Sequence, residues 1–363
     1  MKLIIAGGGT GGHLMPALAL AEAFVEENAA VEPVLVGARR GVEAAILPSR
    51  LFRYHLLSLE PLYRRQWWKN LRWPVVALKT RHECFRVLGQ EQPALVLGTG
   101  GYAAGPVLYW SYRSGIPVAV QEQNAYPGLT TRWLARKADQ VHLGFPEALD
   151  HLKPGATTAV YEYGNPITPP PTPPPQRSAA KGGLGIPQQQ PVVLVVGGSQ
   201  GAMAINETVA ELVRSDGFAD VVLLWSTGHH TWKTYAQFHE PPRRIVKAFW
   251  DPVAQAYAAA DIVVSRAGAM TTAELCAWGL PSILIPLPSA AANHQTKNAQ
   301  AMARAGAAVH IAESELSSAG LMNVLNSLMS DAAELGQMAA AATSRGRPDA
   351  ARKIAREVLR LVG

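Results

Sequence analysis

Cysteine is scarce in this 363-residue sequence, which has only Cys84 and Cys276. The two lie far apart and without metal-ligand spacing, which excludes a disulfide scaffold and fits a reducing cytoplasm. The sequence also lacks the hydrophobic segment of a signal peptide and any apolar run long enough to cross a bilayer. Charged residues are few (17%) beside 48% hydrophobic residues, which indicates a well-buried globular protein rather than a disordered chain.

Length and charge set two further limits. A chain of 363 residues is long for a single core, so two domains are expected. The formal net charge of +6 favours an anionic partner, without distinguishing a nucleotide, a nucleic acid and a lipid headgroup.

Short β-branched runs alternate with helical segments in both halves of the chain. Strands are predicted at 3–6, 33–36, 54–57, 94–97, 118–120 and 140–143, and again at 192–196, 221–224, 244–246, 261–264, 282–285 and 308–310. Continuous apolar strands that alternate with helices are typical of parallel sheets covered on both faces. Both halves are therefore predicted to be doubly wound, Rossmann-like α/β domains.

Prolines mark the expected domain boundary. The run at 165–175 cannot lie in a helix or a central strand, so an extended, semi-rigid connector is predicted there. The predicted organisation is a first domain at 1–163, a proline-rich linker at 164–185, a second domain at 186–345 and a C-terminal amphipathic helix at 346–363 that packs back toward the first domain.

Two glycine-rich turns follow predicted strands, GGTGGH at 8–13 and GGSQGA at 197–202, and a third, GTGGY, lies at 98–102. Glycine lets the backbone approach a ligand, and the helix that follows offers unpaired N–H groups and a positive dipole end. One turn in each half suggests an enzyme that binds substrates in a cleft between two domains. The alternative is that the glycines only permit tight packing of strand against helix.

The first turn also matches the dinucleotide fingerprint, as Gly7-x-Gly9-x-x-Gly12. The end of the second strand has no carboxylate for a ribose 2′-hydroxyl, although Arg39 and Arg40 would tolerate a 2′-phosphate. An NADP-dependent oxidoreductase therefore stays as an alternative.

His13 stands where the first helix is expected to start. The helix dipole disfavours the imidazolium there, which suits a general base, but a histidine that merely hydrogen-bonds at a helix start fits equally well. Glu122 and Asn124 follow the strand at 118–120 and should lie at the same sheet edge. They are candidates to bind a polar substrate, to assist His13 or to cap the next helix.

The second half has two further candidate sites. The turn at 265–270 resembles an anion-binding helix start, and Glu274 suits the hydroxyls of a ribose. Thr271 and Glu274 also form a capping-box pattern, which explains Glu274 without a ligand. His294, Gln295 and Asn298 share one helical face and suit sugar hydroxyls, although a solvated helix face is the commoner explanation.

A basic stretch interleaved with tryptophan lies between residues 62 and 81, without an acidic residue. This composition indicates a peripheral contact with an anionic membrane surface. Binding of single-stranded nucleic acid and a packed helix with a solvated basic face are the alternatives. The candidate membrane-contact residues are Arg64, Arg65, Trp67, Trp68, Lys69, Arg72 and Trp73.

Seven motifs in order give the sequence a family resemblance over essentially its whole length. They are GGTGGHLMPALALA, LGTGGYAAGPV, QEQNAYPG, the GNP at 164–166, GGSQGA, SRAGAMTTAE and NHQTKNA. Together they resemble the MurG family, the UDP-N-acetylglucosamine transferases of peptidoglycan synthesis. The resemblance implies a GT-B fold, with two Rossmann-like domains facing a cleft, and the conversion of lipid I to lipid II on the cytoplasmic face of the inner membrane.

The resemblance also implies roles for the candidate residues. The first domain would bind the undecaprenyl-diphosphate-linked acceptor through Thr10, Gly11, Gly12, Gly100, Gly101 and Tyr102. The second would bind UDP-N-acetylglucosamine through Gly198, Ser199, Gln200, Phe249, Trp250, Ala269, Met270, Thr271, Glu274, His294, Gln295 and Asn298. His13 would be the base of an inverting transfer to the C4 hydroxyl of N-acetylmuramic acid, with Asn124 and Glu122 beside it. Other cell-wall synthesis proteins are further expected partners, and nucleic acid is not.

The expected chemistry needs no cofactor. Inversion requires one base and a stabilised diphosphate leaving group, whose charge the N–H groups of helix starts can carry. The sequence has no Asp-x-Asp pair, so no metal is expected at the diphosphate.

Two positions depart from the family pattern. Thr168 stands where many members have a diphosphate-contacting arginine, which leaves Arg266 as a candidate replacement. His294 replaces the first of two glutamines on the sugar-contacting helix. Besides the NADP enzyme, a nucleotide-sugar epimerase of the same fold and a non-catalytic membrane- or nucleic-acid-binding protein remain alternatives.

Overall fold

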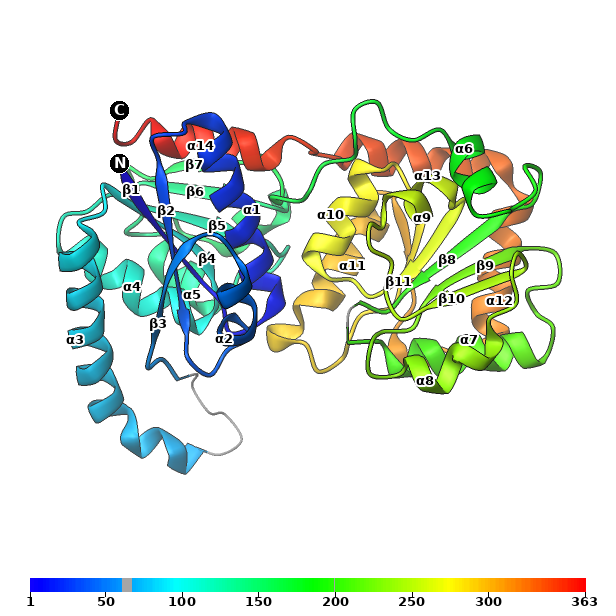
Figure 1. Cartoon of the computed structure of the whole chain (residues 1–363), viewed down its shortest axis with the longest axis horizontal. Coiled ribbons are helices and arrows are strands. Elements are labelled where there is room, and N and C mark those ends of the chain that lie inside the picture. The colour runs from blue at the N-terminus through cyan, green and yellow to red at the C-terminus, as the bar shows by residue number, and fades with distance from the viewer. Residues whose placement is uncertain (61–66, 199) are drawn as a thin grey trace. The chain divides into compact units, whose positions relative to one another are not determined.

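The computed structural model describes residues 1–60, 67–198 and 200–363, without the side chains of Trp67, Lys69 and Asn70. The chain divides into two compact units, one formed by Met1–Thr168 together with Arg347–Gly363 and the other by Pro169–Gly346. Each unit is built on one parallel sheet with helices on its faces (Figure 1).

The first unit has a seven-stranded sheet in the order β3-β2-β1-β4-β5-β6-β7. Its strands are β1 (Lys2–Gly7), β2 (Glu32–Ala38), β3 (Arg53–Leu57), β4 (Leu95–Gly100), β5 (Val118–Glu122), β6 (Gln140–Leu143) and β7 (Ala159–Tyr161). Its helices are α1 (Gly11–Glu27), α2 (Glu43–Ile46), α3 (Trp73–Glu91), α4 (Gly101–Arg113), α5 (Leu129–Leu134) and α14 (Ala350–Leu359), with 3-10 turns η1 (Leu47–Ser49), η2 (Trp67–Arg72) and η3 (Pro146–His151).

Alternate residues of the first sheet enter two different cores. Leu3 and Ile5 of β1 pack with α1 and α14, whereas Ile4 and Ala6 pack with α3, α4 and α5. Successive side chains of a strand point to opposite faces, so a strand buried on both faces must be apolar throughout. This is why β1 has no polar residue between its second and fifth positions.

The last helix of the chain belongs to the first unit. Ile354, Ala355 and Val358 of α14 are fully buried against the core that contains α1. Arg356 and Arg352 pair with Glu27 at 2.6 and 3.4 Å, and hydrogen bonding to Arg356 lowers the pKa of that carboxyl. Burial of apolar side chains therefore provides most of the stability of this contact, because exposed ion pairs contribute little to stability.

The second unit has a six-stranded sheet in the order β10-β9-β8-β11-β12-β13. Its strands are β8 (Val192–Val196), β9 (Val222–Ser226), β10 (Arg244–Lys247), β11 (Ile262–Ser265), β12 (Ser282–Leu284) and β13 (Ala308–His310). Its helices are α6 (Arg177–Gly183), α7 (Met203–Arg214), α8 (Trp232–Tyr235), α9 (Ala254–Ala259), α10 (Ala269–Ala277), α11 (His294–Arg304), α12 (Ser318–Ser330) and α13 (Ala332–Arg345), with 3-10 turns η4 (Ala236–Phe238), η5 (Ala291–Asn293) and η6 (Glu313–Glu315). Trp225 of β9 is the largest fully buried side chain of its core.

The predicted fold class is confirmed, since both halves are parallel-sheet Rossmann-like domains and each of the twelve predicted strands overlaps an observed one. The sequence prediction missed β7, a three-residue edge strand. The proline-rich run at 165–175 forms neither helix nor strand, but α6 lies within the segment that was predicted to be a linker.

Candidate active site

Both units have a topological switch point, and the glycine turns lie at these points. In the first sheet β1 pairs with β2 on one side and β4 on the other, so the turns after β1 and β4 leave from neighbouring strand ends. In the second sheet β8 and β11 pair, with Val196 opposite Ser265, and the turns that follow them are likewise neighbours. Ligands of doubly wound sheets bind at such points.

The first and third glycine turns interlock, and most of their glycines face protein atoms. A Cβ on Gly9 would lie 2.4 Å from the ring of Tyr102, and one on Gly101 would lie 2.0 Å from the carbonyl oxygen of Gly8. Gly100 and Gly101 also have positive φ angles of 95° and 76°, and the His13 ring packs over them. Close packing therefore accounts for these glycines, in agreement with the alternative that they permit tight packing rather than ligand binding.

Gly11 and Gly12 differ from the other glycines of these turns. A Cβ on Gly11 would meet no atom within 4 Å, and one on Gly12 only the Thr10 hydroxyl at 3.8 Å. Both lie in the first turn of α1, whose N–H groups have no partner within the helix. The part of the turn that is open to an anion is thus its second half.

His13 is held by its own helix start. Its Nδ1 lies 3.0 Å from Thr10 Oγ1, and its backbone carbonyl accepts a hydrogen bond from Thr99 Oγ1 at 2.8 Å. Thr99 belongs to β4, so the histidine is connected to both turns.

Glu122 organises the loop after β5. Its Oε1 accepts hydrogen bonds from the backbone N–H and the side-chain amide of Asn124, and its Oε2 accepts one from the backbone N–H of Gly128. Since Gly128 is the residue before α5, the carboxylate fixes where that helix begins. Of the roles considered for Glu122, the structure supports the one at the next helix start.

A buried amide network that the sequence reasoning missed lies beside this loop. The side-chain amide of Gln123 donates to the carbonyl of Thr99, and Asn165 donates to the carbonyl of Gln123. The amide of Gln121 donates to Asn165 Oδ1, and Gln123 also bonds Gln121. Asn165 is the asparagine of the GNP motif, so this network gives that motif a structural role under the site.

In the glycine turn of the second unit, Gly198 is a glycine with open space around it. It has a φ of 78°, and a Cβ there would meet no atom within 4 Å. Gly201, in contrast, packs against the carbonyl of Thr227, and Gln200 Oε1 lies 2.7 Å from His230 Nε2. Ser199 lies outside the described residues.

Glu274 is bound by a neighbour that the sequence pattern did not reveal. The hydroxyl of Tyr257, on α9, donates to its Oε2 at 3.0 Å. Burial raises the pKa of Glu274, while this hydrogen bond works in the opposite direction. The capping-box interpretation is wrong, because α10 starts at Ala269 after Gly268 and Thr271 lies inside the helix. Ala269, Met270 and Thr271 form its first turn.

The predicted sugar-binding face of α11 is only partly solvated, since His294 and Gln295 are half-buried. Asn298 is fully buried and donates to the carbonyl of Ala267 at 3.1 Å, which ties α11 to the turn after β11. Gln295 Oε1 accepts from the backbone N–H of Leu287, and His294 Nδ1 bonds the carbonyl of Ala291. Just before the helix, Ala292 and Asn293 both have left-handed backbone, a strained arrangement typical of ligand-binding segments.

Arg266 lies in the same turn and is held by other partners. It pairs with Glu313 at 2.5 Å and donates to the carbonyls of Ile285 and Pro286. Its charge is therefore already partly compensated, whereas Thr168, at the position of the family arginine, belongs to the other unit.

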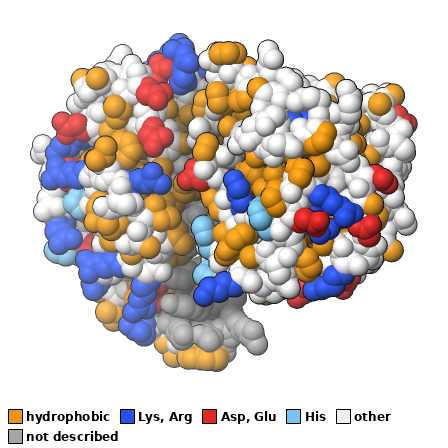
Figure 2. All heavy atoms as spheres, turned by 45° about the vertical axis from the view of Figure 1, so that its right-hand side comes forward, with side chains coloured by type: hydrophobic (Ala, Val, Ile, Leu, Met, Phe, Trp, Pro, Cys, Tyr) orange, Lys and Arg blue, Asp and Glu red, His pale blue; other side chains and the backbone are white. Residues whose placement is uncertain are grey.

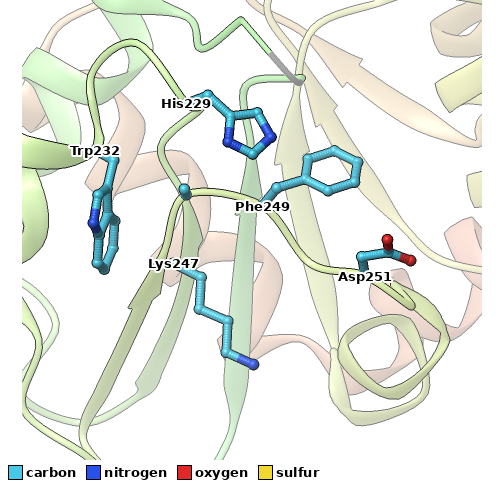
Figure 3. A pocket seen from close by; sticks show the side chains of 6 residues that line it. His229, Trp232, Lys247, Phe249 and Asp251 are labelled. Carbon is cyan, nitrogen blue, oxygen red and sulfur yellow. The ribbon is translucent and has the colours of Figure 1, made fainter. Parts of the chain in front are cut away.

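Phe249 lines a pocket of about 410 Å³ at the carboxyl ends of β9 and β10 (Figure 3). Figure 3 shows the rings of His229 and Phe249 next to each other, and they stack with centroids 5.8 Å apart. Trp250 does not line this pocket: its side chain is 3% exposed, and the ammonium of Lys247 lies 4.0 Å from the centre of its ring. The pocket is lined by His229, Trp232, Lys247, Ala248, Phe249 and Asp251.

The described part of the basic-aromatic stretch, residues 67–81, lies on η2 and α3 of the first unit (Figure 1). Leu71, Val75 and Leu78 are 76, 72 and 67% exposed, while the carboxylates of Glu83 and Glu91 are buried. Figure 2 shows basic side chains gathered at the lower left of the view, with hydrophobic side chains among them. Trp68 and Arg72 are exposed and Trp73 is half-buried.

Four residues of this prediction cannot be placed in the same way. Arg64 and Arg65 lie outside the described residues, as do the side chains of Trp67 and Lys69. Across the ranges that the structure describes, no helix combines the length and the apolarity needed to span a bilayer.

The residues proposed to bind an NADP phosphate have other partners. Arg39 pairs with Glu83 at 3.7 Å, and Arg40 with Glu60 at 3.4 Å. Glu43 instead lies beneath the glycine turn, where its Oε1 accepts the backbone N–H groups of Gly9 and Ala38. This arrangement speaks against the oxidoreductase.

Comparison with known proteins gives one consistent result. Residues 3–143 match the glycosyltransferase family 28 N-terminal domain, and residues 192–354 the C-terminal domain of the same family. The chain is 40% identical to the UDP-N-acetylglucosamine–N-acetylmuramyl-(pentapeptide) pyrophosphoryl-undecaprenol N-acetylglucosamine transferase of Salinibacter ruber, over 99% of this chain and 96% of the relative.

Two solved structures place the fold among its neighbours. The crystal structure of MurG from Acinetobacter baumannii matches with a TM-score of 0.78 and 25% identity, over 99% of both chains. A UDP-GlcNAc 2-epimerase from Neisseria meningitidis matches with a TM-score of 0.65, over 99% of this chain and 100% of that one, at only 13% identity, so it shares the fold alone. The chain therefore belongs to glycosyltransferase family 28 and, within it, to the MurG family.

Proposed function

We propose that this protein transfers N-acetylglucosamine from UDP-N-acetylglucosamine to the C4 hydroxyl of the muramyl sugar of lipid I, giving a β-1,4 link and lipid II. The observation that carries the proposal is the difference between the two glycine turns. Both lie at switch points with open glycines, Gly11 and Gly198, but only the first turn ends in a histidine. The name of the Salinibacter ruber relative describes the same transfer.

His13 is the proposed general base. For its Nε2 to accept the proton of the acceptor hydroxyl, Nδ1 must carry a hydrogen and donate it to Thr10 Oγ1, 3.0 Å away. The hydroxyl oxygen then bonds to the anomeric carbon, and the bond from that carbon to the diphosphate oxygen breaks. UDP leaves with the electron pair, and because the hydroxyl attacks the face opposite the leaving diphosphate, the configuration inverts. Glu122 and Asn124 support this chemistry by fixing the neighbouring loop.

The acceptor diphosphate is proposed to bind at the first turn of α1, near Thr10, Gly11 and Gly12. Gly100, Gly101 and Tyr102 shape this turn from below, because their packing against it sets its conformation. The exposed apolar residues of α3, with their basic neighbours, are proposed to bind the anionic cytoplasmic face of the membrane that holds the lipid acceptor.

The donor is proposed to bind at the second switch point. Gly198, Ser199, Gln200 and the start of α10 surround its diphosphate, whose leaving charge the helix-start N–H groups stabilise without a metal. Glu274 accepts hydrogen bonds from the ribose hydroxyls, and the His229–Phe249 pair stacks beside the uracil. Gln295 and His294 bind the sugar. Asn298 positions them, because its amide is already bonded to Ala267.

Release of UDP in the presence of lipid I tests the proposal, since an epimerase of the same fold acts on UDP-N-acetylglucosamine without an acceptor. Thermal stabilisation by UDP-N-acetylglucosamine, UDP-N-acetylgalactosamine, UDP-glucose and NADPH identifies the donor. Stabilisation by NADPH and by none of the UDP-sugars would refute the proposed transferase function. His13→Ala is expected to lower turnover by roughly 10²- to 10⁴-fold while donor binding stays unchanged. Near-normal turnover would exclude His13 as the base.

A further inference from the structure

Glu43 is a carboxylate that three glycines accommodate. Its side chain is 0% exposed, although it stands in a short surface helix of four residues. A Cβ on Gly8 would lie 1.6 Å from Glu43 Oε1, one on Gly41 1.9 Å from Oε2, and one on Gly37 2.7 Å from Cγ. Gly8 together with Gly37 and Gly41, from two parts of the chain, thus makes the space that this one side chain fills.

The hydrogen bonds of Glu43 join the glycine turn to the sheet. Its Oε1 accepts the N–H of Gly9 at 2.7 Å and the N–H of Ala38, the last residue of β2, at 3.1 Å. Gly9 has a φ of 88°, one of several conformations that glycine adopts readily, so the hydrogen bond to Glu43 is what selects this one. Since Gly9 gives its N–H to Glu43, the N–H groups left to face a ligand are those of the following residues, at the start of α1.

A negative charge behind an anion site opposes anion binding, so the contribution of Glu43 has to be geometric. We propose that Glu43 is a positioning residue for the acceptor: it fixes the Gly8–Gly9 turn so that the first N–H groups of α1 point at the acceptor diphosphate. This inference rests on the proposed function, because it assumes that the acceptor binds at this turn.

Three substitutions distinguish the effect of the length of the Glu43 side chain from the effect of its charge. Glu43→Gln keeps an oxygen at the position of Oε1 and removes the charge. Glu43→Asp keeps the charge but is one methylene too short to reach Gly9. Glu43→Ala removes both. If the position of the oxygen is what matters, Glu43→Gln should keep normal acceptor binding and Glu43→Asp should not.

Steady-state kinetics with lipid I and UDP-N-acetylglucosamine provide the readout. We expect Glu43→Ala and Glu43→Asp to raise the KM for the acceptor about ten-fold, with the KM for the donor within about two-fold of the unaltered protein. Glu43→Gln should leave both values within about two-fold. An unchanged acceptor KM in all three variants, or rescue by Asp and not by Gln, overturns the proposal.

Glu91 supplies the matched control. It is a buried carboxylate of the same unit, bonded to Lys2, Arg53 and His55 at the opposite end of β1. Glu91→Ala should lower the melting temperature without changing the acceptor KM. A similar rise in acceptor KM in Glu91→Ala would mean that general destabilisation explains the result, and would overturn the role of Glu43.

Amide hydrogen exchange separates this proposal from the function on which it rests. If the unaltered protein releases no UDP with lipid I, the proposed function fails. Exchange in the segment 8–14 is still expected to be faster in Glu43→Ala than in Glu91→Ala, because the turn has lost its support. Equal exchange in both variants would refute the positioning role whatever the substrate.

Discussion

Two glycine-to-alanine substitutions in the interlocked turns should have opposite effects. Gly101 has a φ of 76°, and its new Cβ would lie 2.0 Å from the carbonyl oxygen of Gly8. Backbone strain of about 1–3 kcal/mol and overpacking of a similar size both apply there. Gly11 lies in the first turn of α1, and its Cβ would meet no atom within 4 Å.

The expected magnitudes follow from these contacts. Gly101→Ala should lower the free energy of unfolding by roughly 2–6 kcal/mol, a large part of the stability of an ordinary domain. Gly11→Ala should raise it by about 0.5–1 kcal/mol, because alanine is the better helix former. The Gly11 methyl group would occupy the space assigned to the acceptor diphosphate, so the KM for the acceptor should rise about ten-fold while the KM for the donor stays the same.

Urea unfolding together with steady-state kinetics distinguishes the two effects. The decisive pattern is a stable Gly11→Ala protein with impaired acceptor binding beside an unstable Gly101→Ala protein. If Gly11→Ala binds the acceptor normally, the open half of the turn is not the acceptor site. If Gly101→Ala is as stable as the unaltered protein, the interlocking of the two turns is not what holds them.

Three further predictions concern pH and the membrane. Burial raises the pKa of Glu274, so above about pH 4.5 the folded state binds more protons than the unfolded state. The free energy of unfolding should therefore fall as the pH rises through that range. Glu274→Gln should flatten this part of the pH dependence, measured by urea unfolding. Burial lowers the pKa of His142 to about 3, so acidification from pH 6.5 to 4.5 should lower the free energy of unfolding by about 2.3 kcal/mol. His142→Phe, which keeps a ring stacked on Tyr161, should remove that pH dependence. A slope that persists in either variant would assign it to another group. Replacing Leu71 and Leu78 with serine should weaken co-sedimentation with anionic vesicles, while UDP release with a detergent-soluble acceptor should persist. Unchanged co-sedimentation would place the membrane contact elsewhere.

The elements that the sequence predicted well are the ones whose own composition determines them. The apolar strands β1 and β8 and the glycine turns after them are local patterns, and the residues that follow parallel strands necessarily meet at one sheet edge. The strand β7 was missed because three half-buried residues at a sheet edge have no such pattern.

The contacts that the sequence could not predict are between side chains far apart in the chain. Tyr257 bonds Glu274 from a different helix, and Glu43 reaches back over 34 residues to Gly9. A local rule, the capping box, was available for Glu274 and gave the wrong partner, because the helix starts three residues earlier than the pattern requires. For Glu43 a signal did exist: a charged residue flanked by Gly37 and Gly41 just after a buried strand.

The return of α14 to the first unit has a consequence for biosynthesis. The second unit occupies one uninterrupted segment, whereas the core of the first lacks Ile354, Ala355 and Val358 until α14 leaves the ribosome, after the whole of the second unit. Domains generally fold as they emerge, the N-terminal one first. Here the order of completion is reversed, so the α1 side of the nascent first sheet stays partly uncovered until α14 has been synthesised. A chain stopped at residue 346 would leave that surface open to aggregation.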